Sequence, residues 1–343
     1  MPGSGLSAQG GIANETVVNT PVAVTVSTPF TSAPLDRRPN FAQGLGLSAG
    51  ALVADAARRM EVSHDAGGPL QFNIPTKGFG KYVQAMQGSY ATTATLLVGS
   101  AYQQIHNLGS TDGKTFTYQQ GIPSIDGTVN PLTFSGCKVN DWTLTAAPNA
   151  IVDLQLTIDA MDVAPTGAGA LALQTASYAA GAGLFGFHQV TVTSFAAYTV
   201  VAGLWTPTTP TSVGIVRNLT LKGGQPKDNT RWQAGSTTKA EALVNDYQPI
   251  TGQIDIDFAS MALYTQFAAN TSTGIQINCT GSLIGGANYF LLQFTAPAGF
   301  LESGSTPKVT GPGVITVSYP LTFLRDATGN ALQIQIVSTD TSV

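Results

Sequence analysis

Charged side chains are scarce in this sequence. Asp, Glu, Lys and Arg together make up 10% of its 343 residues, whereas they contribute about 25% of an ordinary soluble domain. Surface charge normally keeps a free monomer in solution, so this composition favours a surface that neighbouring chains cover. The net charge of −4 also lacks the positive footprint of a tight nucleic-acid binder.

Cysteine is scarce as well, since the sequence has only Cys137 and Cys279. Each lies inside a strand-like run, and no second cysteine or histidine stands at the spacing of a zinc site. A disulfide between them stays open as an alternative. We favour two buried free thiols, as in proteins of a reducing cytoplasm.

Long apolar runs are absent. Residues 163–216 contain no Asp, Glu, Lys or Arg, but Gly, Thr, Ser, Gln and Pro interrupt the stretch. A membrane-spanning helix needs about 20 consecutive apolar residues, so we expect no membrane segment. The first residues also lack the basic and apolar regions of a signal peptide.

What the sequence has instead is alternation of apolar and polar residues. Such a period of two predicts strands with one face on a core and the other on water or a neighbour. Turn residues separate the runs, so the fold class is mainly β. The clearest runs contain these apolar positions: Leu70, Phe72 and Ile74; Leu154, Leu156 and Ile158; Ile254, Ile256 and Phe258; Leu332, Ile334 and Ile336.

Two short helices are predicted between the strands. The first runs from Thr76 as N-cap to Gly88, with Phe79, Val83 and Met86 on one face. The second begins at Ser260 as N-cap, and presents Leu263 and Phe267 before it ends near Asn270.

The two strand–helix units align with each other. Leu70, Phe72, Ile74, Thr76, Phe79 and Val83 match Ile254, Ile256, Phe258, Ser260, Leu263 and Phe267 at one constant offset. The strand at 154–158 and that at 332–336 lie at a similar separation. Repeated core and cap positions in register predict an internal duplication.

This gives a division into three parts. Residues 1–50 are rich in Gly, Ser, Thr and Pro and predict an extended N-terminal arm, held in place by neighbouring subunits. Residues 51–187 form the first half of the fold and include a loop insertion at 163–187. Residues 188–343 form the second half.

Motifs of enzymes occur without their structural context. Gly46–Gly50 fits G-x-S-x-G, but no buried strand precedes it. Gly181–Gly186 fits G-x-G-x-x-G, yet a strand-like run follows where a nucleotide-binding helix would begin. His64, His106 and His188 lie at no metal-ligand spacing, and His64 is expected in a turn. We expect no enzyme, cofactor or metal.

Four acids stand on the polar faces of predicted strands: Asp153, Asp159, Asp255 and Asp257. Neighbours two apart on one face lie about 7 Å from each other, a separation that a glycosidase pair could use. No aromatic sugar platform accompanies them. We therefore interpret them as surface acids.

Two strands carry a family resemblance. Residues 136–146 read GCKVNDWTLTA and residues 154–160 read LQLTIDA, and this pair resembles the major tail tube proteins of long-tailed phages. The stretches 217–221, 251–258 and 314–324 are similar to that family too. The arm and the uncharged segment 163–187 differ from it.

The resemblance implies a tail-tube-type β-sandwich or barrel with flanking short helices. It implies hexameric rings that stack into a hollow tube around a tape measure protein, with tail terminator and distal tail proteins at the ends. The genome would pass through the bore without specific binding. Asp153, Asp159, Asp255 and Asp257 are then candidates for the bore lining, where they would repel phosphates. The alternative is a decoration or receptor-binding β-protein of the virion.

Overall fold

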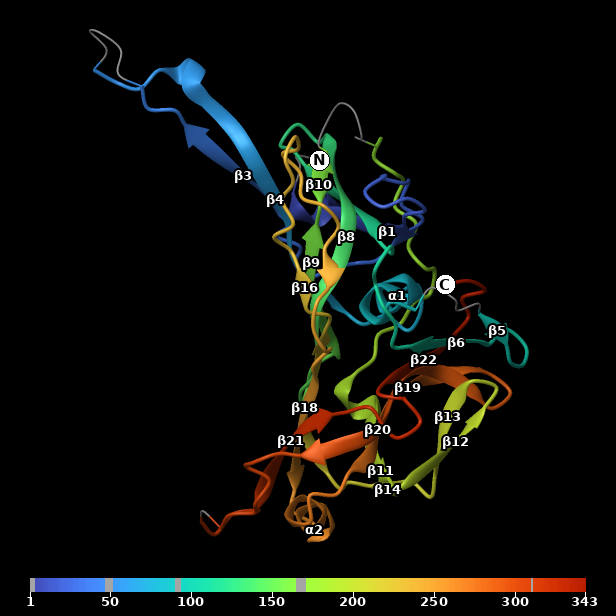
Figure 1. Ribbon diagram of the computed structural model, residues 1–343. Helices are drawn as coiled ribbons and strands as arrows, with labels where there is room; N and C mark the ends of the chain where they lie inside the picture. The colour runs from blue at the N-terminus through green and yellow to red at the C-terminus, as the bar shows by residue number, and fades with distance from the viewer. Residues whose placement is uncertain (1–3, 47–51, 90–93, 165–170, 310) are drawn as a thin grey trace.

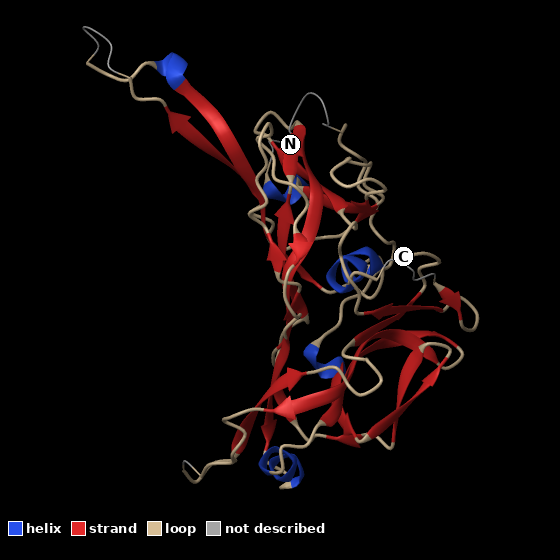
Figure 2. Ribbon diagram, viewed as in Figure 1, coloured by secondary structure: helices blue, strands red, loops and turns tan. Residues whose placement is uncertain are grey.

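A computed structural model describes residues 4–343 except 47–51, 90–93, 165–170 and 310. The chain is almost entirely β-structure, arranged as a curved body from which one long hairpin projects (Figures 1 and 2). The prediction of a mainly β fold with short flanking helices is confirmed. No helix in the described ranges is long and apolar enough to cross a membrane.

The elements of the first half are, in order: η1 (Gly5–Ser7), β1 (Gln9–Asn14), β2 (Val26–Ser27), β3 (Asp36–Gln43), η2 (Ala56–Arg58), β4 (Arg59–Asn73), α1 (Gly80–Gln87), β5 (Thr95–Leu96), β6 (Tyr102–Asn107), β7 (Phe116–Pro123), β8 (Val129–Ala146), β9 (Asp153–Ala160) and β10 (Asp162–Ala164). Those of the second half are: η3 (Phe187–Gln189), β11 (Val190–Phe195), β12 (Ala197–Val201), β13 (Leu204–Thr208), β14 (Thr211–Ser212), β15 (Val216–Gly224), β16 (Lys227–Asp228), β17 (Leu243–Val244), β18 (Ile250–Asp257), α2 (Ala262–Ala268), β19 (Thr273–Gly285), β20 (Asn288–Leu301), β21 (Thr316–Phe323) and β22 (Gln333–Ser338).

One antiparallel sheet runs through the whole body, and we call it the main sheet. Its strand order is β3–β4–β9–β8–β15–β18–β21–β20. Apolar side chains of alternate residues point to one face, where α1 and the strands β6, β19 and β22 cover them (Figure 1). The opposite face of the sheet lies on the concave side of the body.

The two halves of the chain repeat one pattern of strand pairing. In the first repeat (residues 9–164) β1 pairs with β2 and β7, β8 pairs with β7, β9 and β10, and β4 pairs with β3 and β9. In the second repeat (residues 190–338) β11 pairs with β14 and β19, β20 pairs with β19, β21 and β22, and β18 pairs with β15 and β21. The same topology is therefore built twice.

The repeated topology corrects one of the sequence correspondences. By pairing, the counterpart of β9 is β21, because each lies between the strand before the helix and the long strand after it. Residues 332–336, which the sequence aligned with 154–158, belong to the region of β22, the counterpart of β10. The first repeat has β5 and β6 inserted after α1, and this insertion changes the offset for every later element.

Two joints connect the repeats. β8 of the first repeat pairs with β15 of the second along residues 141–146 and 219–224. The inserted strand β6 pairs with β22. His106 lies in this second joint with 0% of its surface exposed.

The helix α1 packs on the core of the first repeat. Phe79, Val83 and Met86 are buried as predicted, and the Phe72 ring contacts Phe79 and Tyr82. Gly88 closes the helix with a left-handed φ of 67°, which glycine adopts at little cost.

The predicted helix starts are wrong. α1 begins at Gly80 with Phe79 as N-cap, because the hydroxyl of Thr76 accepts a hydrogen bond from Gly183 N–H instead. α2 begins at Ala262, with Met261 at the N-cap. Ser260 Oγ accepts only a long contact of 3.4 Å from Ala262 N–H.

The N-terminal fifty residues divide between the body and the hairpin. β1 pairs with β7, and its Ile12 side chain has 0% of its surface exposed. β3 lies before the predicted end of the arm at residue 50 and pairs with β4, which lies after it. Both strands therefore belong to the projecting hairpin (Figure 1).

Candidate functional site: an assembly surface

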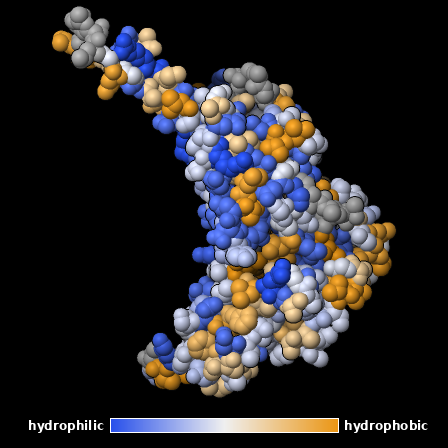
Figure 3. All heavy atoms as spheres, in the orientation of Figure 1, coloured by the Kyte–Doolittle hydropathy of each residue, from blue (hydrophilic) through white to orange (hydrophobic). Residues whose placement is uncertain are grey.

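The concave face of the main sheet is polar. Along each strand the residues between the core positions point to this face. They are mostly exposed Thr, Ser and Gln with half-buried Asn and Asp. Figure 3 shows hydrophilic residues gathered along the concave margin. Because this face runs across both repeats, the chain presents one continuous polar wall.

Two of the four predicted acids lie open on this wall. Asp153 on β9 accepts a hydrogen bond of 2.9 Å from Gln71 Nε2. Asp255 on β18 accepts from Gln253, Asn218 and Ser318. Neither carboxylate has a cation within salt-bridge distance among the described residues, so both give the wall negative charge.

The other two acids are neutralised by cations. Asp257 forms a bidentate pair with Arg217, at 2.8 Å and 2.7 Å, which lowers the pKa of that carboxyl. Asp159 is buried against Lys239. Burial raises the pKa of Asp159, while the Lys239 ammonium lowers it in part. The sequence therefore placed all four on polar strand faces, but only two are unpaired.

Sequence reasoning missed two further charges on the wall. Asp141 on β8 and Lys222 on β15 are both exposed, and they point to the polar face. A register shift between Val139 and Asp141 interrupts the alternation of β8. The alternation of apolar and polar residues therefore did not predict that Asp141 lies on the polar face. Lys222 follows the plain alternation of Leu219 and Leu221, so its position could have been read from the sequence.

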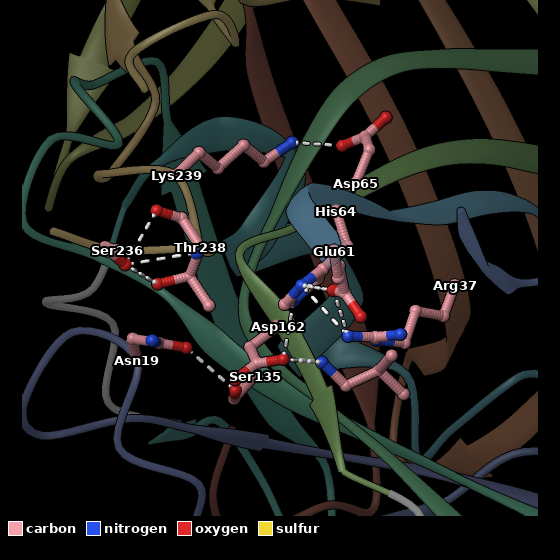
Figure 4. A network of polar contacts seen from close by, with 11 residues as sticks. Asn19, Arg37, Glu61, His64, Asp65, Ser135, Asp162, Ser236, Thr238 and Lys239 are labelled. Atoms are coloured by element: carbon pink, nitrogen blue, oxygen red, sulfur yellow. Dashed lines mark hydrogen bonds and ion pairs between the residues drawn. The ribbon is translucent and has the colours of Figure 1, made fainter. Parts of the chain in front are cut away.

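Residues 225–249, which we call the cover segment, connect β15 to β18 and lie over the first repeat. Lys239 Nζ bonds Asp65 at 2.6 Å and also bonds Asp159. Lys138 Nζ bonds Glu241 at 2.6 Å and the Ala242 carbonyl at 2.7 Å. These ion pairs attach the second repeat to β4, β8 and β9, and Figure 4 shows the pair between Lys239 and Asp65.

The base of the projecting hairpin holds a second polar network. His64 Nδ1 lies 2.8 Å from Glu61 and Nε2 lies 2.9 Å from Asp162, while Arg37 bonds Glu61 at 2.5 Å (Figure 4). The expectation that His64 lies in a turn is wrong, since it stands in β4. The backbone N–H of His64 donates to the Thr237 carbonyl at 3.0 Å, so the network also contacts the cover segment.

Beyond this base, the hairpin carries apolar side chains into solvent. Leu45 is 87% exposed, Met60 64% and Phe41 47%. The sheet edge of β3 pairs with nothing but β4 in the described part of the chain. An exposed edge with apolar side chains is a surface that pairs with another chain.

No chemical site emerges from the other motifs. Gly181–Gly186 is a loop, and a single 3-10 turn, η3, followed by the strand β11 stands where a nucleotide-binding helix would begin. Most of Gly46–Gly50 lies outside the described residues. No cluster of His, Cys, Asp and Glu in the described ranges has metal-ligand geometry. Both cysteines are buried and unpaired, and burial raises the pKa of Cys279 to about 12.

A duplicated β-fold with a continuous polar wall, open sheet edges and exposed apolar side chains defines a self-assembling structural subunit. The model of the phage tail tube protein family matches residues 5–323, so the chain belongs to that family. It is a structural component of the virion tail and not an enzyme. No curated protein matches the chain.

Proposed function

We propose that the chain forms closed rings that stack into the hollow tube through which the genome leaves the virion. The observation that carries this proposal is the main sheet, which has a polar concave face, a free edge at β3, and a second end at β20 that is unpaired on its β19 side only beyond Gly299 in the described residues. A head-to-tail contact between such edges generates a ring when its rotation closes. Closure removes the exposed edges that would otherwise aggregate.

The concave wall is proposed to line the bore. Asp153 and Asp255 would then repel the phosphates of passing DNA, while Asp257 and Asp159 would add little because Arg217 and Lys239 neutralise them. A basic wall would hold DNA through counterion release. Since charges in solution are screened over about 10 Å, these acids act only close to the duplex.

The proposed ring has six copies of the strand topology, following the hexameric rings that the resemblance implies. Because each chain contains the topology twice, three chains supply six copies. The mass of an isolated ring distinguishes a ring of three chains from a ring of six, since each chain contributes 35.4 kDa. The proposed partners are a second copy of the chain within and between rings, a tape measure protein in the bore, and terminator and distal tail proteins at the ends.

Negative-stain electron microscopy of the concentrated protein tests the proposal. Rings or hollow tubes are expected. Discrete monomers or compact trimers without a bore would contradict it and favour the decoration or receptor-binding alternative. A reconstruction of the tube then locates Asp153 and Asp255, and side chains on the outer wall would overturn the assignment to the bore.

A further inference from the structure

We propose that subunits join by pairing β3 of one copy with the C-terminal end of β20 of the next, as β15 pairs with β8 inside the chain. This inference rests on the proposed ring and identifies its contact. The partner is a second copy of this chain, and the joint inside the chain is the template.

The internal joint has a defined place on β8. The N-terminal part of this strand lies between β7 and β10, and its C-terminal part lies between β15 and β9. β15 therefore follows β7 along one edge of β8. The strand that occupies this place belongs to the other repeat.

The same place on β20 is open. The N-terminal part of β20 lies between β19 and β22, and its end pairs with β21 through residues 299–301. On the edge shared with β19, the pairing stops at Gly299 and Thr273. In the described residues no strand continues along this edge beyond Gly299, and the counterpart of the place that β15 occupies begins at Glu302, directly after Leu301 ends β20.

The strand that should fill this place is β3, the counterpart of β15. Each pairs with the strand before the helix, β3 with β4 and β15 with β18. Ser32 exchanges both backbone hydrogen bonds with Gln71, so by alternation the backbone of Arg37 faces away from β4. β3 thus offers its free edge outward, at the opposite end of the body from β20 (Figure 1).

The two edges are also compatible in register. Transferring the internal pairs Gly223–Trp142 and Gly224–Asp141 to the counterpart positions places Arg37 opposite Ser303 and Arg38 opposite Glu302. Glu302 N–H bonds the Pro320 carbonyl, so Ser303 faces the open edge as Arg37 does. Arg38 already pairs with Asp36 and Asp65 of its own chain, and Glu302 is exposed and of opposite charge to it, so this register places no like charges directly opposite each other.

The connecting segments support the same joint. Residues 39–46 and 52–65 of the hairpin take the place in the first repeat that the cover segment takes in the second. The cover segment lies on the repeat next to it through Lys239 and Glu241. The hairpin has no such repeat beside it in one chain, and its apolar side chains stay exposed. A neighbour joined through β3 would place a second repeat there.

Disulfide trapping tests the joint. A chain with Arg38→Cys and Glu302→Cys is assembled and oxidised with diamide. Opposite residues of this type lie about 4.5–5.5 Å apart between Cα atoms, within disulfide range. Arg58→Cys with Glu302→Cys is the matched control, because Arg58 lies farther out on the same hairpin. The native cysteines are buried and do not compete.

The expected result is a ladder of disulfide-linked chains from the matched pair and monomers from the control. Rings that form with no cross-link in the matched pair would overturn the joint and leave the proposed function standing. Wild-type protein that forms no ring or tube would instead contradict the proposed function.

A second variant probes the edge without cysteines. Ser303 precedes Gly304 (φ 107°) in a turn closed by the bond from Ser305 N–H to the Glu302 carbonyl. Proline is favoured at this turn position, so Ser303→Pro keeps the free subunit folded while it removes the outward N–H. The loss of about one hydrogen bond raises the concentration needed for assembly about threefold to tenfold. Ser303→Ala is the control, and equal assembly of the two variants would contradict the pairing.

Discussion

The cover segment and the distal hairpin occupy the same place in the two repeats, yet they have different surroundings. The cover segment lies on the first repeat, with Lys239 1% exposed and paired to two acids. The hairpin extends into solvent with Leu45 87% exposed. One segment has a neighbouring repeat to bind and the other has none in the same chain. In the proposed joint, a second subunit supplies the neighbouring repeat that the hairpin lacks.

A second difference lies at the ends of the long strands. The end of β8 pairs on both edges, with β9 and β15. The end of β20 pairs with β21 alone beyond Gly299. In both comparisons the second repeat completes the first, whereas the corresponding place on the second repeat is unfilled in the described residues.

The largest expected effect comes from the anchor of the cover segment. Lys239→Ala leaves Asp159 buried without its cation, and breaking a buried pair in this way costs about 3–5 kcal/mol. Urea unfolding of the unassembled subunit measures the loss. Because burial raises the pKa of Asp159, the loss should shrink as pH falls and the carboxyl is protonated. Lys222→Ala, at an exposed wall position, should change stability by less than about 0.5 kcal/mol. A similar loss in both variants would show that the anchor does not hold the segment.

The next effect compares the two cores. Leu70 and Ile254 are counterparts and are 1% and 4% exposed. Truncation of either to alanine should cost about 2–5 kcal/mol through lost burial and a residual cavity. Since β8–β15 and β6–β22 join the repeats, both variants should unfold in one shared transition. Two separate transitions in calorimetry would show that the repeats are independent domains.

A pH effect is expected from the β6–β22 joint, whose strand β6 has no counterpart in the second repeat. Burial lowers the pKa of His106 to about 4, whereas an unfolded histidine has a pKa of about 6.5. The unfolded chain therefore binds the proton first, and stability falls as pH drops from about 6.5 to about 4. The loss reaches about 3.5 kcal/mol at most, because each pKa unit corresponds to about 1.4 kcal/mol.

His106→Gln should remove this dependence between pH 4 and 6.5, because glutamine does not titrate. His188 is exposed, so His188→Gln is the matched control and should leave the profile unchanged. The free energy of unfolding measured across this pH range decides it. A wild-type profile that is flat over the range would contradict the buried neutral state of His106.

The sequence predicted the strands and both helices because their signals are local. Alternation at Leu70 and Phe72, or at Leu154 and Leu156, requires no knowledge of the partner strand. The correspondence between β9 and β21 in the two repeats was missed. It follows from strand partners that are distant in sequence, and the β5–β6 insertion changes the sequence offset between the repeats. The fates of Asp153 and Asp159 differ for the same reason. Both acids lie on one face of β9. Asp159 is neutralised because Lys239 of the cover segment contacts it, whereas Asp153 has only the hydrogen bond from Gln71.

The smallest effect on the subunit is expected at the distal hairpin. Leu45→Ser and Met60→Ser remove exposed apolar side chains, at 87% and 64% exposure, so each should change the stability of the free subunit by less than about 0.5 kcal/mol. If a neighbouring subunit buries them, the same changes weaken assembly, because each buried aliphatic side chain contributes about 1.5–3 kcal/mol. Light scattering of assembling protein measures the second quantity and urea unfolding the first. Leu97→Ser, on an exposed loop of the first repeat at 37% exposure, is the control. Assembly that is equally insensitive to all three changes would mean that the hairpin projects into solvent in the tube as it does in the single chain.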